Sequence, residues 1–305
     1  MGTLKELKSK RVIRLSVEKV IGTKLMTNKK PSLVTLVELD ELIDVVDIGA
    51  NPNDGVAPYK NLLDENLARV FGFEPNEDAL GRLNAMKGPN ETYIGKAVYD
   101  GSQQQLKICQ AEGMTSLLEP NMKLLRYFNG FPRWGKVKER LPIQTIRLDD
   151  VEEIQNIDYL KIDIQGGELE VFKNATNSLD KCCVIQTEVE FLPMYEGQPL
   201  FSEVEMFLRG LGFVFHRFSS LVSRIIKPLQ INNDVLGELS QVTWADAIFI
   251  KDFTKFNELD QVNLKKTAVI LNDIYGSFDI VMRALMVIDE KSNTNYSKQY
   301  LKYLS

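Results

Sequence analysis

The stretch Val45-Val-Asp-Ile-Gly-Ala-Asn51 decides the fold, because it reads as a buried strand that runs into a tight glycine turn. Glu74 stands 25 residues after Gly49, at the end of a second strand in Phe71-Gly-Phe-Glu-Pro75. In a doubly wound sheet the ligand binds outside the carboxyl ends of the strands. A glycine there lets the backbone approach the ligand, and an acid can accept hydrogen bonds from two ribose hydroxyls. The two segments predict a site for an adenosine-bearing cofactor.

Strand-like and helical segments alternate around this stretch from about residue 36 to residue 190. The alternation predicts βαβ units in a parallel sheet with helices on both faces. The predicted strands cover 42–48, 69–73, 92–99, 159–164 and 182–189, and the helices between and after them cover 58–67, 78–86, a segment ending at 173, and 202–211. Two further runs, Phe213–Phe218 and Ala247–Phe253, lack a crossover helix and are expected to pair antiparallel at one edge of the sheet. Helices over 262–274 and 278–290 are expected to form a hairpin.

The loop after the first strand indicates which cofactor binds. A dinucleotide site needs Gly-x-Gly-x-x-Gly, with the pyrophosphate at a helix N-terminus. The loop from Gly49 to Gly55 lacks that spacing, and Asp47 and Asp54 make it acidic. An acidic loop repels pyrophosphate and suits a cation, so the favoured cofactor is S-adenosylmethionine, which carries a sulfonium and an ammonium group. Asp47 is predicted to orient the ammonium end.

Four ordered motifs carry a resemblance to a known family. They are Asp-Ile-Gly-Ala-Asn (47–51), Gly-Phe-Glu-Pro (72–75), Arg-Leu-Asp-Asp (147–150) and Leu-Lys-Ile-Asp-Ile-Gln-Gly-Gly-Glu-Leu (160–169). With these motifs, roughly residues 40 to 253 resemble the FkbM family of S-adenosylmethionine-dependent methyltransferases. The resemblance implies a class I methyltransferase fold, a seven-stranded sheet whose last strand is antiparallel to the rest. It also implies O-methylation, often of sugar hydroxyls in envelope glycans or glycolipids and sometimes of secondary metabolites.

The resemblance assigns cofactor contacts residue by residue. Positions 47, 49, 50 and 51 would line the methionine end, Glu74 would bind the ribose, and Pro75 and the segment 97–100 would lie near the adenine. The implied cofactor-binding residues are Asp47, Gly49, Ala50, Asn51, Glu74, Pro75, Ala97 and Asp100. In one respect the sequence departs from the family, because residues 52–54 intervene before Gly55 where family loops often continue with another glycine soon after the asparagine.

Candidate catalytic residues follow the predicted strands. Methyl transfer needs in-line positioning, and a hydroxyl nucleophile benefits from a base within hydrogen-bond reach. Asp163 is the best-placed carboxylate, and Glu188 and Glu190 end the fifth strand. Such oxygens also suit Mg²⁺ or Ca²⁺, but no tight ligand spacing is present and no metal is assigned. His216 is the only histidine and has a suitable pKa, although a lone strand histidine is commonly structural.

Residues 113–135 form an aromatic-rich segment between the third and fourth predicted strands. Aromatic faces with polar neighbours suit sugar recognition, so the segment is interpreted as a lid on the substrate side. A packed cap would have the same composition. The expected acceptor is a hydroxylated small molecule or a glycan.

Charge and cysteine content limit partners and compartment. The 305 residues carry a net charge of −5, but residues 1–30 hold nine Lys/Arg against two acids, or +7, which leaves −12 on the other 275. A mildly acidic chain is a poor general nucleic-acid binder, and no apolar stretch is long enough to span a bilayer. The three cysteines form no disulfide framework, which favours the cytoplasm. The basic leader is expected to be an amphipathic helix, with peripheral membrane contact as its functional alternative.

The predicted organisation is a basic helical segment over 1–36, an FkbM-like methyltransferase domain over 37–253 and a helical hairpin over 254–305. One alternative is a nicotinamide-dependent sugar-modifying enzyme, which usually has a Tyr-x-x-x-Lys pair; no tyrosine here is followed four residues later by lysine. The other alternative is a non-catalytic adapter that uses the C-terminal helices to bind a partner. The sequence does not indicate an oligomeric state.

Overall fold

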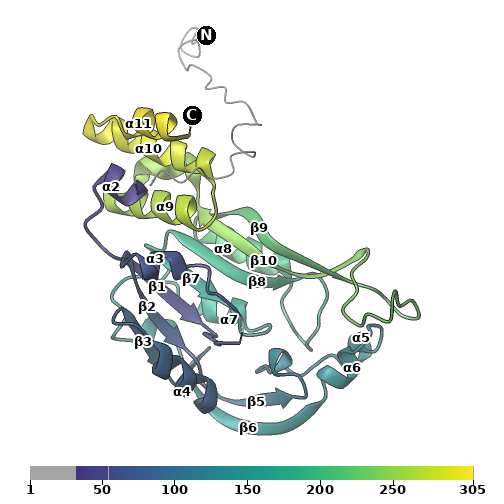
Figure 1. Cartoon of the computed structure of the whole chain (residues 1–305). Coiled ribbons are helices and arrows are strands. Elements are labelled where there is room, and N and C mark those ends of the chain that lie inside the picture. Colours follow the sequence, from purple (N-terminus) through teal and green to yellow (C-terminus); the bar gives the residue numbers. More distant parts are fainter. Residues whose placement is uncertain (1–31, 54, 305) are drawn as a thin grey trace.

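A seven-stranded sheet forms the centre of the computed structural model, which describes residues 32–53 and 55–304 (Figure 1). In spatial order the strands are β3 (Glu91–Ile94), β2 (Ala68–Phe73), β1 (Ile43–Ile48), β7 (Tyr159–Ile162), β8 (Val184–Glu190), β10 (Gln241–Lys251) and β9 (Phe213–Arg224). Strand β10 is antiparallel to both neighbours, and the other pairs are parallel. The predicted α/β fold of the class I methyltransferase type is therefore confirmed, with the antiparallel strand one place in from the edge.

Helices cover both faces of the sheet because its central strands are apolar on both sides. All six residues of β1 are buried. One face packs against α7 (Glu168–Lys173) and α8 (Phe201–Gly210), in a cluster that includes Val46, Ile162 and Phe172. This buried sheet fixes the strand ends at which the candidate site lies.

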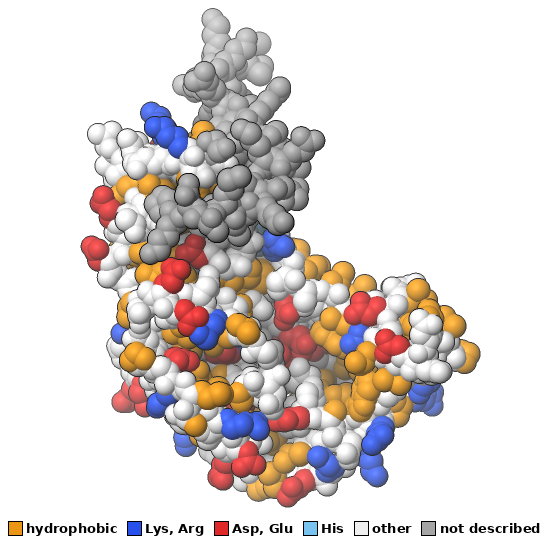
Figure 2. All heavy atoms as spheres, viewed as in Figure 1, with side chains coloured by type: hydrophobic (Ala, Val, Ile, Leu, Met, Phe, Trp, Pro, Cys, Tyr) orange, Lys and Arg blue, Asp and Glu red, His pale blue; other side chains and the backbone are white. Residues whose placement is uncertain are grey.

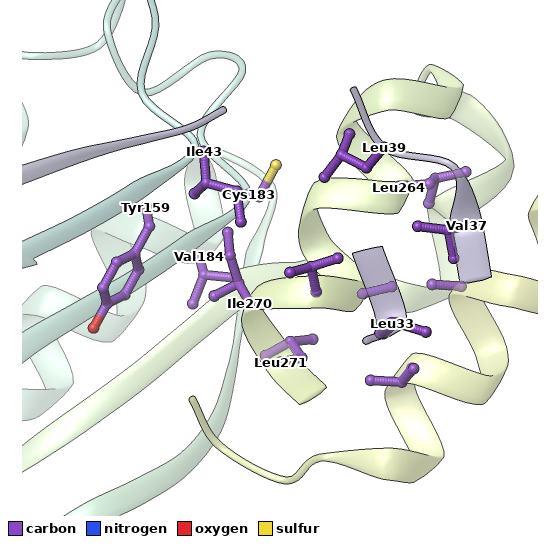
Figure 3. Close-up of a cluster of buried hydrophobic side chains, with 14 of the residues drawn as sticks. Leu33, Val37, Leu39, Ile43, Tyr159, Cys183, Val184, Leu264, Ile270 and Leu271 are labelled. Atoms are coloured by element: carbon purple, nitrogen blue, oxygen red, sulfur yellow. The ribbon is translucent and has the colours of Figure 1, made fainter. Parts of the chain in front are cut away.

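The opposite face packs against helices from both ends of the chain. These are α2 (Leu33–Val37), α3 (Lys60–Asp64), α9 (Gln261–Asp273), α10 (Phe278–Ser292) and α11 (Tyr296–Leu304). Figure 3 shows Ile270 and Leu271 of α9 beside Val184 of β8, with Leu33 and Val37 of α2 further along the same cluster. The cluster joins residue 33 to residue 300, so the C-terminal helices share one core with the sheet.

Two helical predictions differ from the structure. Helix α3 has five residues where the sequence predicted ten. Helix α4 (Glu77–Met86) lies where the sequence predicted a helix, and its N-cap is Asn76, whose Oδ1 accepts a hydrogen bond from Ala79 N at 2.9 Å. The C-terminal region contains a third helix, α11, in addition to the predicted hairpin. Helix α11 starts where Asp289 accepts the backbone N–H groups of Tyr296 and Ser297, a link from the preceding helix that sequence periodicity does not reveal.

A smaller sheet was not predicted. The expected strand over 92–99 is divided: β3 ends at Ile94, and β4 (Ala97–Val98) pairs parallel with β6 (Val137–Ile146), which pairs antiparallel with β5 (Gln103–Cys109). Strands β5 and β6 are rich in polar residues and only partly buried, so they carry little hydrophobic periodicity. Residues 103–146, called the lobe from here on, also contain η2 (Glu112–Met114), α5 (Met122–Leu125) and α6 (Phe131–Trp134).

The aromatic residues of the lobe form a core of their own. Phe128 and Phe131 are at most 5% exposed and pack with Met194 and Tyr195, which follow β8. Tyr127 remains exposed. The segment that was interpreted as a sugar-binding lid is thus mainly packed, which is the alternative that the composition left open.

The amino ends of β1 and β7 carry a buried ionic cluster. Asp158 is fully buried, and its Oδ2 accepts Lys266 Nζ and the backbone N–H of Asp44, each at 2.8 Å. Asn156 donates to Oδ1 of Asp158 at 2.8 Å, and Arg69 pairs with Asp44. Burial alone would lower the pKa of Lys266, but the hydrogen bond and charge of Asp158 raise it. The cluster ties α9 to the sheet.

Candidate active site

The turn after β1 locks three strand ends together. Gly49 N and Ala50 N both donate to the carbonyl oxygen of Phe73 at 3.0 Å, and Asp163 N donates to that of Ile48 at 3.0 Å. Gly49 has φ +83°, and a Cβ there would lie 2.0 Å from the Asp163 carbonyl oxygen. The close approach explains why glycine is required at this position.

Asp47 already has partners for both carboxylate oxygens. Tyr59 OH donates to its Oδ2 at 2.5 Å, and Lys161 Nζ lies 3.1 Å from its Oδ1. Burial, and then the charge of Asp47, raise the pKa of Tyr59, so the phenol stays a donor. Asp47 therefore braces β1 against β7 and the segment before α3. Its role toward an ammonium group stays a prediction.

Glu74 lies at the end of β2 and is 7% exposed. Its Oε1 accepts the backbone N–H of Asn76 at 2.7 Å, and its own N–H donates to the carbonyl of Ile94 at 3.1 Å. These bonds hold the carboxylate at the carboxyl edge of the sheet, next to the half-buried Pro75. The role of Glu74 toward a ribose stays a prediction.

The side chain of Asn51 forms a hydrogen bond within the loop that follows β1. Its side chain accepts the backbone N–H of Asn53 at 2.9 Å, and Asn53 Nδ2 donates to Glu112 of the lobe at 3.3 Å. A cavity of about 560 Å³ opens beside this loop, between α3 and α4, and its wall includes Asp47, Ala50 and Asn51. The carboxylates at the ends of β7 and β8 do not line it. Asp54, predicted to add to the acidity of the loop, lies outside the described residues.

Ala97 and Asp100 flank a turn that anchors the lobe. Ala97 is buried in β4. Asp100 accepts hydrogen bonds from Ser102 N at 2.9 Å, Ser102 Oγ at 2.7 Å and Thr145 Oγ1 at 3.2 Å. Burial would raise the pKa of Asp100, but these hydrogen bonds lower it. The carboxylate holds the turn to β6, and its predicted place near an adenine is not tested by these contacts.

A carboxamide joins the two predicted catalytic acids. Gln165 Nε2 donates to Asp163 Oδ1 and to Glu188 Oε2, each at 2.8 Å. Asp163 follows β7 and Glu188 lies on β8, so the bridge spans neighbouring strand ends. The sequence identified both acids but not Gln165, because its side chain makes long-range contacts that no local pattern encodes.

Two buried acids, Glu168 and Glu190, and the half-buried Asp246 surround this pair. Glu168 caps the loop into α7, where its Oε1 accepts Ile164 N at 2.9 Å and Gly166 N at 3.2 Å. Burial raises the pKa of Glu168 to about 7. Burial also raises the pKa of Glu188, and the charges of Asp163, Glu190, Glu168 and Asp246 add to that rise. A group of carboxyls with raised pKa values is typical of functional sites.

In the described part of the chain, the carboxylates of this group form no ion pair with a lysine or an arginine. Among residues 32–53 and 55–304, no ion pair within 4 Å joins Asp163, Glu188 or Glu190 to a lysine or arginine. The same residues contain no group of three or more His, Cys, Asp or Glu arranged to hold a metal ion. Figure 2 shows acidic side chains gathered in a recess at the centre of one face of the molecule.

His216 lies away from these carboxylates. It is on β9 between the residues that pair with Phe249 and Ile248, and Ile248 is level with Gln186 in the middle of β8. Its Nε2 lies 2.7 Å from Ser277 Oγ at the start of α10. Burial lowers the pKa of His216. The structure thus does not bring His216 together with Asp163 and Glu188, and it favours the structural alternative for this residue.

Comparisons with known proteins give matches to methyltransferases. The model of the family described as "Methyltransferase FkbM domain" matches residues 47–215. The 2-O-methyltransferase NoeI of Sinorhizobium fredii is 26% identical over 202 residues, which cover 59% of this chain and 80% of that protein.

Two solved methyltransferases are similar in structure at low scores. The FkbM methyltransferase of Methylobacillus flagellatus has a TM-score of 0.38 and 12% identity; the match covers 68% of this chain and 43% of that one. The magnesium protoporphyrin IX methyltransferase of Synechocystis, solved with S-adenosylmethionine, has a TM-score of 0.35 and 11% identity, over 72% and 76% of the two chains. The fold assignment therefore rests on the strand order. From the family match over more than half of its length, the chain belongs to the FkbM family of methyltransferases.

Proposed function

We propose that this protein is an S-adenosylmethionine-dependent O-methyltransferase whose acceptor is a hydroxyl, most simply that of a saccharide. The observation that carries the proposal is the Asp163–Gln165–Glu188 bridge beside the Gly49 turn, which offers a proton acceptor without a bound cation. The family match supports methyl transfer, and the name of the NoeI relative supports an oxygen acceptor. The family match gives no support to the nicotinamide-dependent alternative.

The residues at the strand ends fit the proposed cofactor. The backbone at Gly49 leaves no room for a side chain, the buried Glu74 provides a carboxylate for ribose hydroxyls, and the surrounding acids favour a cation. Bound there, the cofactor would supply an electrophilic methyl group on a sulfonium and leave as S-adenosylhomocysteine. Pro75 and Asn51 lie on the chain segments next to these groups and are proposed to shape the adenine and methionine ends.

The two bridged acids would remove the proton from the hydroxyl that accepts the methyl group and would orient that hydroxyl. As the acceptor oxygen forms its bond to the methyl carbon, the carbon–sulfur bond breaks and the hydroxyl must lose its proton. Asp163 or Glu188 would take that proton, and the other acid would orient the acceptor by hydrogen bonding. A base positioned in this way typically contributes 10²–10⁴-fold to the rate. Neutral, hydroxyl-rich acceptors suit an acidic recess better than anionic ones, which the carboxylates would repel.

The cytoplasm is the proposed compartment. Cys109, Cys182 and Cys183 are buried thiols without disulfide bonds, which suits a reducing environment. Within the described ranges, every helix is too short or too polar to cross a membrane. The proposed amphipathic helix of residues 1–36 falls mostly on residues outside the described part, so its membrane contact stays a prediction.

Calorimetric titration with S-adenosylhomocysteine tests the cofactor assignment. Wild type and Glu77→Gln should bind alike, because Glu77 is exposed on α4, whereas Glu74→Gln should bind at least tenfold more weakly through loss of charged hydrogen bonds. Methyl transfer from labelled cofactor to a panel of saccharides then tests the acceptor. The proposal fails if wild type does not bind the product, or if it binds and methylates only nitrogen, carbon or thiol acceptors.

A further inference from the structure

Gln165 holds a backbone conformation that glutamine rarely adopts. Its φ is +62°, in the left-handed region, and Gly166 follows at +103°. A glycine or asparagine at position 165 would meet this backbone demand at lower cost. A strained residue that persists beside a candidate site indicates that its side chain is needed there.

The side chain of Gln165 uses every polar atom it has. Its amide nitrogen donates one hydrogen to Asp163 and the other to Glu188, and its Oε1 accepts from Tyr195 OH at 3.1 Å. Burial raises the pKa of Tyr195, so the phenol remains a donor. Because carboxylate oxygens only accept hydrogen bonds, and the phenol hydroxyl donates to the amide oxygen, the contacts on both sides fix which end of the amide faces the acids.

The lobe holds Gln165 from the other side. Ser116 Oγ donates to the carbonyl oxygen of Gln165 at 2.7 Å and accepts Leu118 N at 2.9 Å. Ser116 is 2% exposed, and Tyr195 belongs to the hydrophobic cluster that the lobe forms with the loop after β8. The packed aromatics of the lobe therefore brace Gln165 against the strand ends.

We propose that Gln165, braced by Tyr195 and Ser116, is a positioning residue that orients Asp163 and Glu188 as the proton-accepting pair. The proposal rests on the proposed function and deepens it. Two carboxylates on adjacent strand ends would otherwise repel each other and share a proton. A carboxamide that donates to both stabilises both charges without neutralising either as a lysine would.

The charges that face Glu188 determine in which direction loss of the Gln165 amide changes the ionisation of the acid pair. They come from Asp163 after β7, Glu168 on α7, Glu190 on β8 itself and Asp246 on β10, and all oppose ionisation of Glu188. Lys161 on β7 pairs with Asp47 and lowers the pKa of Asp246. Loss of the Gln165 amide should therefore move the pH at which the pair becomes ionised upward.

Gln165→Asn and Tyr195→Phe test this role. Asparagine tolerates the left-handed backbone but is one carbon too short to reach both acids, and phenylalanine removes only the hydroxyl that orients Gln165. For Gln165→Asn we expect kcat at pH 7 to fall about 100-fold, the acidic limb of the kcat–pH profile to move upward, and the Kd for S-adenosylhomocysteine to stay within twofold. Tyr195→Phe should act in the same direction with a smaller effect. Tyr127→Phe, on the exposed tyrosine of the lobe, is the matched control and should match wild type.

A carboxyl titration by ¹³C NMR gives a readout that needs no turnover. The resonance lost in Glu188→Gln identifies Glu188, and its midpoint should be higher in Gln165→Asn and Tyr195→Phe than in wild type. Unchanged midpoints, or an unchanged pH profile, overturn the role of Gln165, and Tyr195→Phe decides if Gln165→Asn does not fold. Raised midpoints in a protein that methylates no hydroxyl would instead show that the proposed function is wrong while the charge-setting contact is right.

Discussion

Both ends of strand β7 carry an acid, a fully buried one at the amino end and a half-buried one at the carboxyl end, and the two acids have opposite kinds of partners. At the amino end, Asp158 receives a lysine, a backbone N–H and an amide. At the carboxyl end, Asp163 shares one neutral amide with Glu188 and stands among other acids. Compensation by a cation marks an acid that holds the fold together. An acid that has no cationic partner, at the point where parallel strands end, is typical of a functional site.

Removal of the cation at the amino end should give the largest change in stability. Lys266→Met leaves Asp158 buried without its ion pair, which typically costs 3–5 kcal/mol of unfolding free energy. Equilibrium denaturation in urea measures this loss. The double variant Lys266→Met/Asp158→Asn should recover part of it. If the free energy of unfolding of Lys266→Met lies within about 1 kcal/mol of wild type, the contrast between the two ends of β7 does not hold.

A methyl group at Gly49 should have the next largest effect. Gly49→Ala adds a clash with the Asp163 carbonyl to the cost of a positive φ, so we expect a loss of about 2–3 kcal/mol and no detectable binding of S-adenosylhomocysteine. Gly55→Ala is the control, because Gly55 has φ +91° but nothing within 4 Å of the added carbon. Urea denaturation and calorimetry compare the two. Equal losses at both glycines would mean that the close approach at Gly49 is unimportant.

The same acid-to-amide change should have opposite signs at the two ends. The folded pKa of Glu188 is raised, so wild type loses stability as the pH rises from about 4.5 through that pKa. Glu188→Gln removes this loss and should stabilise the protein by roughly 1 kcal/mol at pH 8 but not at pH 4. Burial raises the pKa of Asp158 as well, but Asp158→Asn leaves the buried Lys266 without this partner and should therefore destabilise the protein at pH 8. Melting temperatures across pH 4–8 test the contrast, and a destabilised Glu188→Gln at pH 8 would contradict it.

The smallest effect is expected at His216. Burial lowers its folded pKa, so wild type loses stability as the pH falls through the ordinary histidine value of 6.5. His216→Gln should reduce that loss and keep kcat within about twofold of wild type, because the side chain contacts Ser277 and not the acids. A large fall in kcat, with cofactor binding intact, would return His216 to the catalytic group.

Local sequence patterns predicted the parts of the site that local structure determines. The β1 run and its glycine turn, Glu74 after β2, and Asp163 after β7 all lie where the strand pattern put them. Gln165, Tyr195 and Lys266 were missed because their partners come from distant segments. The smaller sheet was missed because β5 and β6 are rich in polar residues and lack an apolar period.

The ionic cluster at Asp158 also bears on the order in which the chain can fold. Lys266 is 108 residues away from Asp158, and the same core includes side chains from Leu33 to Tyr300. A nascent chain that ends near residue 253 has all seven strands but lacks α9, α10 and α11, which pack on the face with Val45 and Ile248. Completion of the core therefore waits until residues 261–304 have left the ribosome, and contacts of such high sequence separation slow folding.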